Sequence, residues 1–434
     1  MRGAWSSRKE SRQIAPPTPA DLAPYAGPMD SDLDPSRAIR GLKWAFVLVG
    51  IADGTLLPYI PLYLFERGLG ASWIGVVLAV TASASLLLGV AWAYLADRKF
   101  SPERMVVVAS VAAAAAALLL PVAGRGASLA VVLVVLSLAR SPFMLLDPIA
   151  LRRLRVTRRT DYARIRLRMS AGWAAAAIGS GALFQVTGLR LIPFVYAPLS
   201  ILVGLWVWHA VKPSGGALPT GPAPAAVRAS RIPVALMTFL VSCLLLGAAL
   251  AATQNFLVLR INFLGGGALL IGAAAAFQAA TEIPTMGYTH VLTKRLSHRA
   301  LFAIGCGIYL VTFIAWAFVT DPLIAALLKL VVGVAFALTY VAAVMIASEL
   351  APSHLRATGQ ALMKSVLFGL APVVGSVGGG LIYGELGPRT MFLLATGVVG
   401  AAGLIALLVI PARETAGQPT GLMLPAPEPV TPRA

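Results

Sequence analysis

Two acidic residues lie deep inside apolar stretches of the sequence, where a charged side chain is rare. Asp53 lies ten residues beyond Lys43, and Glu282 lies twelve residues before Lys294. In a helix that rises about 1.5 Å per residue, both carboxyls would lie near the middle of a hydrocarbon core about 30 Å thick. A carboxyl group in such a low-dielectric medium can bind and release a proton at neutral pH. The sequence therefore predicts Glu282 and Asp53 as proton-coupling groups, and a structural ion pair or packing hydrogen bond is the alternative for each.

Other polar residues inside the apolar stretches are candidates for a substrate cavity. Arg140 and Asp147 lie two helical turns apart and could pair with each other or with Arg166, either to bind a carboxylate or to hold the structure together. Lys329 and Lys364 lie closer to the predicted helix ends, where snorkelling explains them more simply, although Lys364 stays a candidate. The remaining candidates share an uncharged polar group: Tyr59, Gln254, Asn255, Gln278 and Tyr340.

The composition indicates a membrane protein. Charged residues make up 12% of the 434 residues and hydrophobic residues 58%, and the mean hydropathy is +0.83. A soluble globular protein carries about 25% charged residues, so the composition argues against a water-soluble fold. Each apolar stretch is near the roughly 20 residues that a helix needs to span the hydrocarbon core, and none alternates as a barrel strand would. The sequence predicts an all-α membrane protein with twelve transmembrane helices, at about 41–64, 72–96, 104–123, 127–147, 165–186, 191–211, 232–262, 268–291, 299–319, 322–347, 357–384 and 388–411.

These helices form two blocks of similar length that share a sequence pattern. The first block contains GALFQVTGLR at 181–190, and the second contains GLIYGELGPR at 380–389, so each has two glycines and an arginine at the same spacing. We interpret the pattern as a trace of tandem duplication. The predicted units are a disordered N-terminal tail, a six-helix bundle, a linker rich in Pro, Gly and Ala, a second six-helix bundle and a disordered C-terminal tail, at 1–36, 37–211, 212–231, 232–411 and 412–434.

The distribution of cations predicts the orientation of the chain in its membrane. The formal net charge is +18, and most Lys and Arg residues lie in the linker and the even-numbered loops, with eight arginines from Arg152 to Arg168. The odd-numbered loops hold only Arg67, Arg125, Arg190, Arg260 and Arg389. By the positive-inside rule, both termini are cytoplasmic and the arginine-rich loop lies against lipid headgroups. Without interleaved aromatic residues for base stacking, this loop does not indicate nucleic acid as a partner.

Motifs of other function classes are missing from the sequence. It contains no phosphate-binding GxxxxGK[ST], no HExxH and no GxSxG motif. The two cysteines, Cys243 and Cys306, lie inside apolar segments and have no metal-binding spacing. We therefore predict no enzyme activity, no metal site and no cofactor.

One loop carries a family signature. The stretch AYLADRKFSPER at 93–104 resembles the G-x-L-A-D-R-x-G-R-[KR] motif of the major facilitator superfamily, with both glycines replaced. Together with the two six-helix blocks, this resemblance implies the major facilitator fold. It also implies that Asp97 and Arg98 belong to a cytoplasmic gate that controls which side of the transporter opens, where ordinary topology charge is the alternative reading.

Four further stretches resemble one branch of that superfamily, which contains phenylpropionate permease, nucleoside–proton symporters and, more distantly, lactose permease. They are PYIPLYL at 58–64, YARIRLRMS at 162–170, QAATEIP at 278–284 and RATGQ at 356–360. The resemblance implies a monomeric secondary active transporter of the inner (plasma) membrane that works by alternating access. We predict proton symport of a small organic solute, and proton-coupled antiport that exports drugs or metabolites is the alternative.

Overall fold

The computed structural model describes residues 35–98, 100–124, 126–156, 162–211, 232–352 and 355–410. These ranges are almost entirely helical, and they contain no β-strand. The predicted linker and almost all of both predicted tails lie outside the described residues. The all-α prediction is confirmed.

The first half of the chain forms six membrane-length helical stretches, several of which are interrupted at prolines. Pro58 and Pro142 each lie in a short 3-10 turn that joins two α-helices, because proline lacks the N–H that would continue the α-helical ladder. In chain order the elements are α2 (Pro35–Leu56), η2 (Leu57–Tyr59), α3 (Ile60–Glu66), α4 (Ala71–Arg98), α5 (Pro102–Leu119), α6 (Ala127–Arg140), η3 (Ser141–Leu145), α7 (Leu146–Val156), α8 (Tyr162–Thr187), η4 (Leu189–Leu191), α9 (Ile192–Trp206) and η5 (Val207–Val211).

The second half repeats this arrangement with longer uninterrupted helices. Its elements are α10 (Val234–Phe263), α11 (Ala268–Leu292), α12 (His298–Phe318), α13 (Pro322–Leu350), α14 (Arg356–Ser365), η7 (Val366–Leu370), α15 (Ala371–Glu385) and α16 (Gly387–Val409). Among the described residues, eleven stretches are long and apolar enough to cross a membrane. The twelfth is α8, which has 26 residues but begins with the arginine-rich segment that lowers its hydropathy. The predicted count of twelve is therefore right in architecture and approximate by these criteria.

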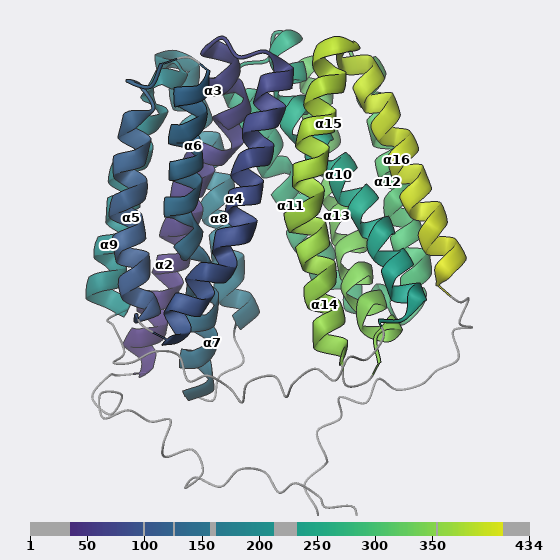
Figure 1. Cartoon of the computed structure of the whole chain (residues 1–434), viewed down its shortest axis with the longest axis horizontal. Coiled ribbons are helices and arrows are strands. Elements are labelled where there is room, and N and C mark those ends of the chain that lie inside the picture. The colour runs from purple at the N-terminus through teal and green to yellow at the C-terminus, as the bar shows by residue number, and fades with distance from the viewer. Residues whose placement is uncertain are drawn as a thin grey trace, which may run out of the picture.

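The helices assemble into two bundles that lie side by side (Figure 1). In the first bundle, α2 packs on α8 and α9, and α5 packs between α6 and α9. In the second, α11 and α12 pack on α13, and α10 packs on α15 and α16. The bundles meet along two helix pairs, α8 with α11 and α4 with α15. Each pair joins the second helix of one bundle to the fifth helix of the other, so the interface has a twofold pseudosymmetry.

Glycines at equivalent positions bring the two bundles into backbone contact. A methyl group added to Gly181 of α8 would lie 2.8 Å from the carbonyl oxygen of Ala268, and one added to Gly380 of α15 would lie 2.8 Å from that of Ala71. Ala268 and Ala71 are the first residues of α11 and α4. Both contacts therefore lie at the same end of the molecule, which we call the far end. The opposite end, where η5 stops and α10 starts, is called the linker end.

The structure also explains the second glycine of the repeated sequence pattern. Gly188 and Gly387 both have φ of +82°, a backbone conformation that only glycine adopts at little cost. Each follows the fifth helix of its bundle and redirects the chain into the sixth. The repeated pattern thus encodes one close approach between bundles and one left-handed turn in each half.

Two of the arginines in odd-numbered loops cap helices. Arg67 donates hydrogen bonds to the carbonyl oxygens of Leu120, at 3.0 Å, and Ala123, at 2.5 Å, which lie at the end of the third helical stretch. Arg260 donates to the carbonyl oxygen of Val319 at 2.9 Å, at the end of the ninth. The last carbonyls of a helix lack intrahelical partners, and a cation near them is favourable. Arg67 and Arg260, which lie in loops with few cations, therefore have a local structural role.

The glycine contacts at the far end generate a first prediction. In a protein with Ser72→Cys as a reporter, Gly380→Val should force α15 away from α4, because a side chain at Gly380 meets backbone atoms that cannot rotate aside. Ser72 lies against this contact, with its hydroxyl 3.5 Å from the carbonyl oxygen of Gly380. We expect the thiol introduced at this position to react with a thiol reagent at least several-fold faster in the Gly380→Val background.

The matched control is Gly378→Val, in the same helix, where an added methyl group meets no atom within 4 Å. The native Cys243 and Cys306 are buried and give a low background. Equal labelling of the introduced thiol in the two glycine variants would contradict the proposed role of Gly380 in closing the far end.

Candidate functional site

A cavity of about 490 Å³ lies between the two bundles. From the first bundle it is lined by residues at the junction of α2 and α3 and by one face of α8; from the second it is lined by α10, α11 and one residue of α13. Its polar and charged lining side chains are Asp53, Arg166, Ser170, Gln254, Asn255, Gln278, Glu282 and Lys329. The rest of its wall is mostly apolar. Glu282 and Asp53, the two predicted proton-coupling residues, therefore lie on the same cavity.

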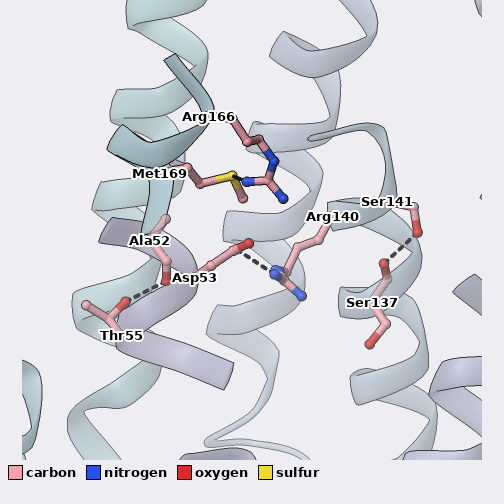
Figure 2. Close-up of polar contacts among 8 residues, drawn as sticks. All are labelled: Ala52, Asp53, Thr55, Ser137, Arg140, Ser141, Arg166 and Met169. Carbon is pink, nitrogen blue, oxygen red and sulfur yellow. Dashed lines mark hydrogen bonds and ion pairs between the residues drawn. The ribbon is translucent and has the colours of Figure 1, made fainter. Parts of the chain in front are cut away.

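Asp53 forms a tight ion pair inside the first bundle. Its Oδ1 accepts a hydrogen bond from the guanidinium of Arg140 at 2.5 Å, and the two side chains are only 12% and 14% exposed (Figure 2). This pair joins α2 to α6. Arg140 therefore pairs with Asp53 and not with Asp147, the partner that the sequence offered.

The cation in the second bundle is Lys329, which is 6% exposed. Its amine donates hydrogen bonds to Oε1 of Gln254 and, at 2.6 Å, to Oε1 of Gln278. Three helices, α13, α10 and α11, meet at this point. The snorkelling interpretation of Lys329 is wrong, because the side chain points into the cavity and not toward a helix end.

Glu282 lies one turn beyond Gln278 on α11 and lines the cavity. The charges of Lys329 and Arg166 act on it through space, and Gln278 is its hydrogen-bonding neighbour. Among the described residues, no cationic nitrogen lies within the 4.0 Å that defines a salt bridge to Glu282. The two acids of the cavity therefore have different surroundings.

Arg166 lies at the edge of the cavity near the linker end. Its side chain is 46% exposed and approaches Asp147 at 3.9 Å, one of the two pairings that the sequence left open. It also lies 2.6 Å from the sulfur of Met169 (Figure 2). Asp147 itself does not belong to the cavity lining. A half-exposed pair at this distance contributes little stability, so Arg166 is free to interact with other groups.

The structure places three other predicted cavity residues elsewhere. Tyr59 is completely buried and donates its hydroxyl hydrogen bond to the carbonyl oxygen of Ala177, so it holds α8 in place. Tyr340 stacks on Phe336, with ring centroids 5.7 Å apart, in an aromatic group beside the cavity. Lys364 is exposed on α14. None of the three lines the cavity.

Asn255 does line the cavity, and so do Ser170 and Trp173, which were not predicted from the sequence. The amide of Asn255 donates to the hydroxyl of Ser376 at 3.1 Å, which joins α10 to α15 beside the cavity. Trp173 of α8 lines the cavity as an aromatic wall. A large aromatic residue seven positions after Arg166 was the available signal, because both then lie on the same face of a helix.

The predicted gate residues lie in a less completely described region. Asp97 and Arg98 end α4, but their side chains are outside the described residues. Within the described ranges, no group of three or more His, Cys, Asp and Glu side chains is arranged to hold a metal ion.

The arrangement can bind a small polar solute and exchange a proton. Within one enclosure, the cavity offers a carboxyl that no described cation pairs with, a buried amine, three amides and a tryptophan face. Its volume is in the range of about 300–1,000 Å³ that small-molecule sites occupy. Because elements of both bundles contribute, any relative movement of the bundles changes the site.

Comparisons with known proteins agree with this architecture. The model of the MFS_1 like family matches residues 42–394. The maltose permease of Geobacillus stearothermophilus is 27% identical over 382 residues, which cover 86% of this chain and 95% of the permease. The crystal structure of the nucleoside transporter NupG superposes with a TM-score of 0.74 at 16% identity, over 86% of this chain and 98% of that one. A peptide transporter structure, POT, gives a TM-score of 0.70 at 14% identity, over 86% and 93% of the chains.

The ion pair of the first bundle generates a second prediction. Asp53→Leu leaves the guanidinium of Arg140 buried without its partner, and Arg140→Met leaves the carboxylate alone; removing one partner of a buried pair costs about 3–5 kcal/mol. We expect either single variant to lower the unfolding temperature in detergent strongly. The double variant should recover most of the loss, because two apolar side chains need no charge compensation.

The control is Asp147→Asn, which removes the half-exposed pair with Arg166 and should cost about 0–1 kcal/mol. If the double variant is as unstable as the sum of the single ones, Asp53 and Arg140 do not act as a pair.

Proposed function

The chain belongs to the MFS_1 like family and is a secondary transporter with the major facilitator fold, and we propose that it couples uptake of a small organic solute to an inward flow of protons. The observation that carries the proposal is Glu282, an acid on the cavity between the bundles that has no ion-pair partner in the described part of the chain. A proton that binds there changes the charge of the enclosure in which the solute also binds. Proton and solute binding are thereby linked.

The contrast between the two acids supports Glu282 as the proton carrier. Asp53 is held by Arg140 at 2.5 Å within its own bundle, so losing that charge would leave a buried guanidinium unpaired. Protonating Glu282 breaks no direct ion pair of the described residues, because its cationic neighbours act on it at a distance. We therefore assign the exchanged proton to Glu282 and a structural role in the first bundle to Asp53.

The way the bundles touch supports alternating access. Gly181 and Gly380 support a closed far end through backbone contacts, which part as units when the bundles rock. In the proposed cycle, units 37–211 and 232–411 rotate against each other about the cavity. Asp97 and Arg98 are proposed to serve the opposite end as the gate that the family signature implies.

The solute that fits the lining is small, with both a polar and an apolar side. Gln254, Asn255 and Gln278 provide hydrogen bonds, and Trp173 provides a flat apolar face for a ring. The relatives are named as transporters of maltose, nucleosides and peptides, which are all polar molecules of modest size. We propose a solute of that kind, carried by a monomer.

The charge asymmetry of the loops supports the proposed location. Most Lys and Arg residues lie at the linker end, so this end and both termini are proposed to face the cytoplasm. The protein would then be a multi-pass protein of the cell's inner (plasma) membrane, with lipid headgroups around the arginine-rich segment before α8.

The proposed function predicts that Glu282→Gln abolishes solute-driven proton movement. Purified protein is reconstituted in liposomes that contain a pH-sensitive dye, and candidate solutes are added outside. We expect acidification of the lumen with the wild-type protein and at least a tenfold lower rate with Glu282→Gln, because an amide cannot carry the proton. Solute exchange without net proton movement should survive in the variant.

The matched control is Glu385→Gln, which changes an exposed acid at the end of α15 and should acidify the lumen as the wild type does. Equal acidification by Glu282→Gln would make Glu282 structural and Asp53 the proton carrier. Alkalinisation of the lumen on solute entry would instead mean proton antiport, and export would replace uptake.

The proposed orientation has its own test. A fluorescent reporter that matures only in the cytoplasm, fused after Ala434, should be bright, and a phosphatase that is active only outside the inner membrane should be inactive at the same position. The same phosphatase inserted after Gly265, in the turn between α10 and α11, should be active. The reverse pattern would overturn the orientation.

A further inference from the structure

Lys329 is a buried amine that forms no salt bridge with a carboxylate of the described chain. It is 6% exposed, and its amine reaches the neutral oxygens of Gln254 and Gln278. No carboxylate oxygen of the described residues lies within 4.0 Å of this amine; Glu282 acts on it through space. An isolated ammonium in a low-dielectric interior costs several kcal/mol unless an anion pairs with it. The described surroundings of Lys329 therefore lack a paired negative group.

The packing of three helices fixes the amine at the cavity wall. Thr281 donates a hydrogen bond to the carbonyl oxygen of Leu330 at 2.6 Å, which ties α11 to α13 one residue beyond Lys329. Gly333, one turn further along α13, lets the backbone of α11 approach closely. The two glutamines that accept hydrogen bonds from the amine are joined to each other by a 3.1 Å hydrogen bond. The lysine is thus held in a rigid frame and lines the same cavity as Glu282.

The charge balance of the cavity with solute bound indicates that the partner of Lys329 is negatively charged. Asp53 is already paired with Arg140, so it contributes no free negative charge. In the proposed function, on which this inference rests, Glu282 carries its proton when the solute is bound. Two charged lining residues then remain: Arg166, which has Asp147 at 3.9 Å, and Lys329, whose amine has no paired carboxylate in the described part of the chain. A solute with one negative charge would balance Lys329 while the bundles rotate about the loaded cavity.

We propose that Lys329, framed by Gln254 and Gln278, is the subsite for a carboxylate group of the solute. The solute is then an organic monocarboxylate, whose body lies against Trp173 and the apolar part of the lining. One proton on Glu282 and one carboxylate on Lys329 cross together. The transported pair carries no net charge, whereas a neutral solute with one proton would carry a single positive charge.

The experiment uses full-length protein in liposomes that contain a pH dye, with the membrane potential clamped by a potassium gradient and valinomycin. The solutes are hydroxylated and aromatic monocarboxylates, each paired with its own primary amide, which has the same shape without the charge. Protein-free liposomes give the background from acids that cross the lipid unaided. We expect lumenal acidification with members of the carboxylate series only, at a rate that changes less than about twofold between zero and inside-negative potential.

Variants connect this selectivity to the lysine. Lys329→Gln should reduce carboxylate-driven acidification at least tenfold, and Lys329→Arg, which keeps the charge, should retain a measurable part with a raised KM. The matched control is Lys294→Gln, an exposed lysine of the same bundle, which should behave as the wild type. Gel filtration and an unfolding temperature show whether each variant is folded.

The possible outcomes test the carboxylate subsite and the proposed proton symport separately. If amides drive acidification as well as their acids do, and inside-negative potential accelerates them, the carboxylate subsite is overturned while proton symport stands. If Lys329→Gln folds and still transports carboxylates at the wild-type rate, Lys329 is not the subsite. If carboxylates move through the protein without any proton, the proposed coupling fails while the subsite stands. If no solute moves protons or exchanges, both are overturned.

Discussion

The cost of placing a charge in hydrocarbon organises this molecule. An ionisable side chain near the middle of the membrane is tolerated only where protein surrounds it, so such groups collect inside the bundles or between them. Asp53 and Arg140 satisfy each other at 2.5 Å within the first bundle. Among the described residues, Lys329 has amide oxygens as its partners, and Glu282 has no salt-bridge partner. The charges that remain unsatisfied are therefore those on the cavity, where a proton or a solute can reach them.

The second constraint is backbone proximity between the bundles. In a membrane, helices do not gain by burying apolar surface from lipid, so close packing of small residues provides the attraction between them. Gly181 and Gly380 supply this contact at equivalent places, each against the first residue of the facing helix. Such a contact involves few long side chains that would have to be unpacked. It can therefore close one end of the cavity firmly and still separate during a transport cycle.

The depth of a residue in the membrane could be predicted from the sequence, but the direction in which its side chain points could not. Membrane thickness converts length and apolarity into spanning helices, and a constant rise per residue gives the depth of Glu282 and Asp53. Position along the chain predicts that Lys329 snorkels and that Tyr59 lines the cavity. In the structure Lys329 lines the cavity, and Tyr59 is completely buried outside it. Facing depends on which neighbours pack against a helix. The partner of Arg140 accordingly comes from another helix, 87 positions away.

The two bundles share a fold but contribute different charged groups to the cavity. The first bundle contributes a direct ion pair between Asp53 and Arg140, in which each group is the other's counter-charge. The second contributes an acid and an amine that are close enough to sense each other but too far apart to pair directly. Adding a proton to Glu282 removes its through-space compensation of Lys329, and an anion near Lys329 replaces it. In the proposed cycle, a cation and an acid held apart in one frame make proton and anion binding mutually favourable, which a directly formed ion pair between them would prevent.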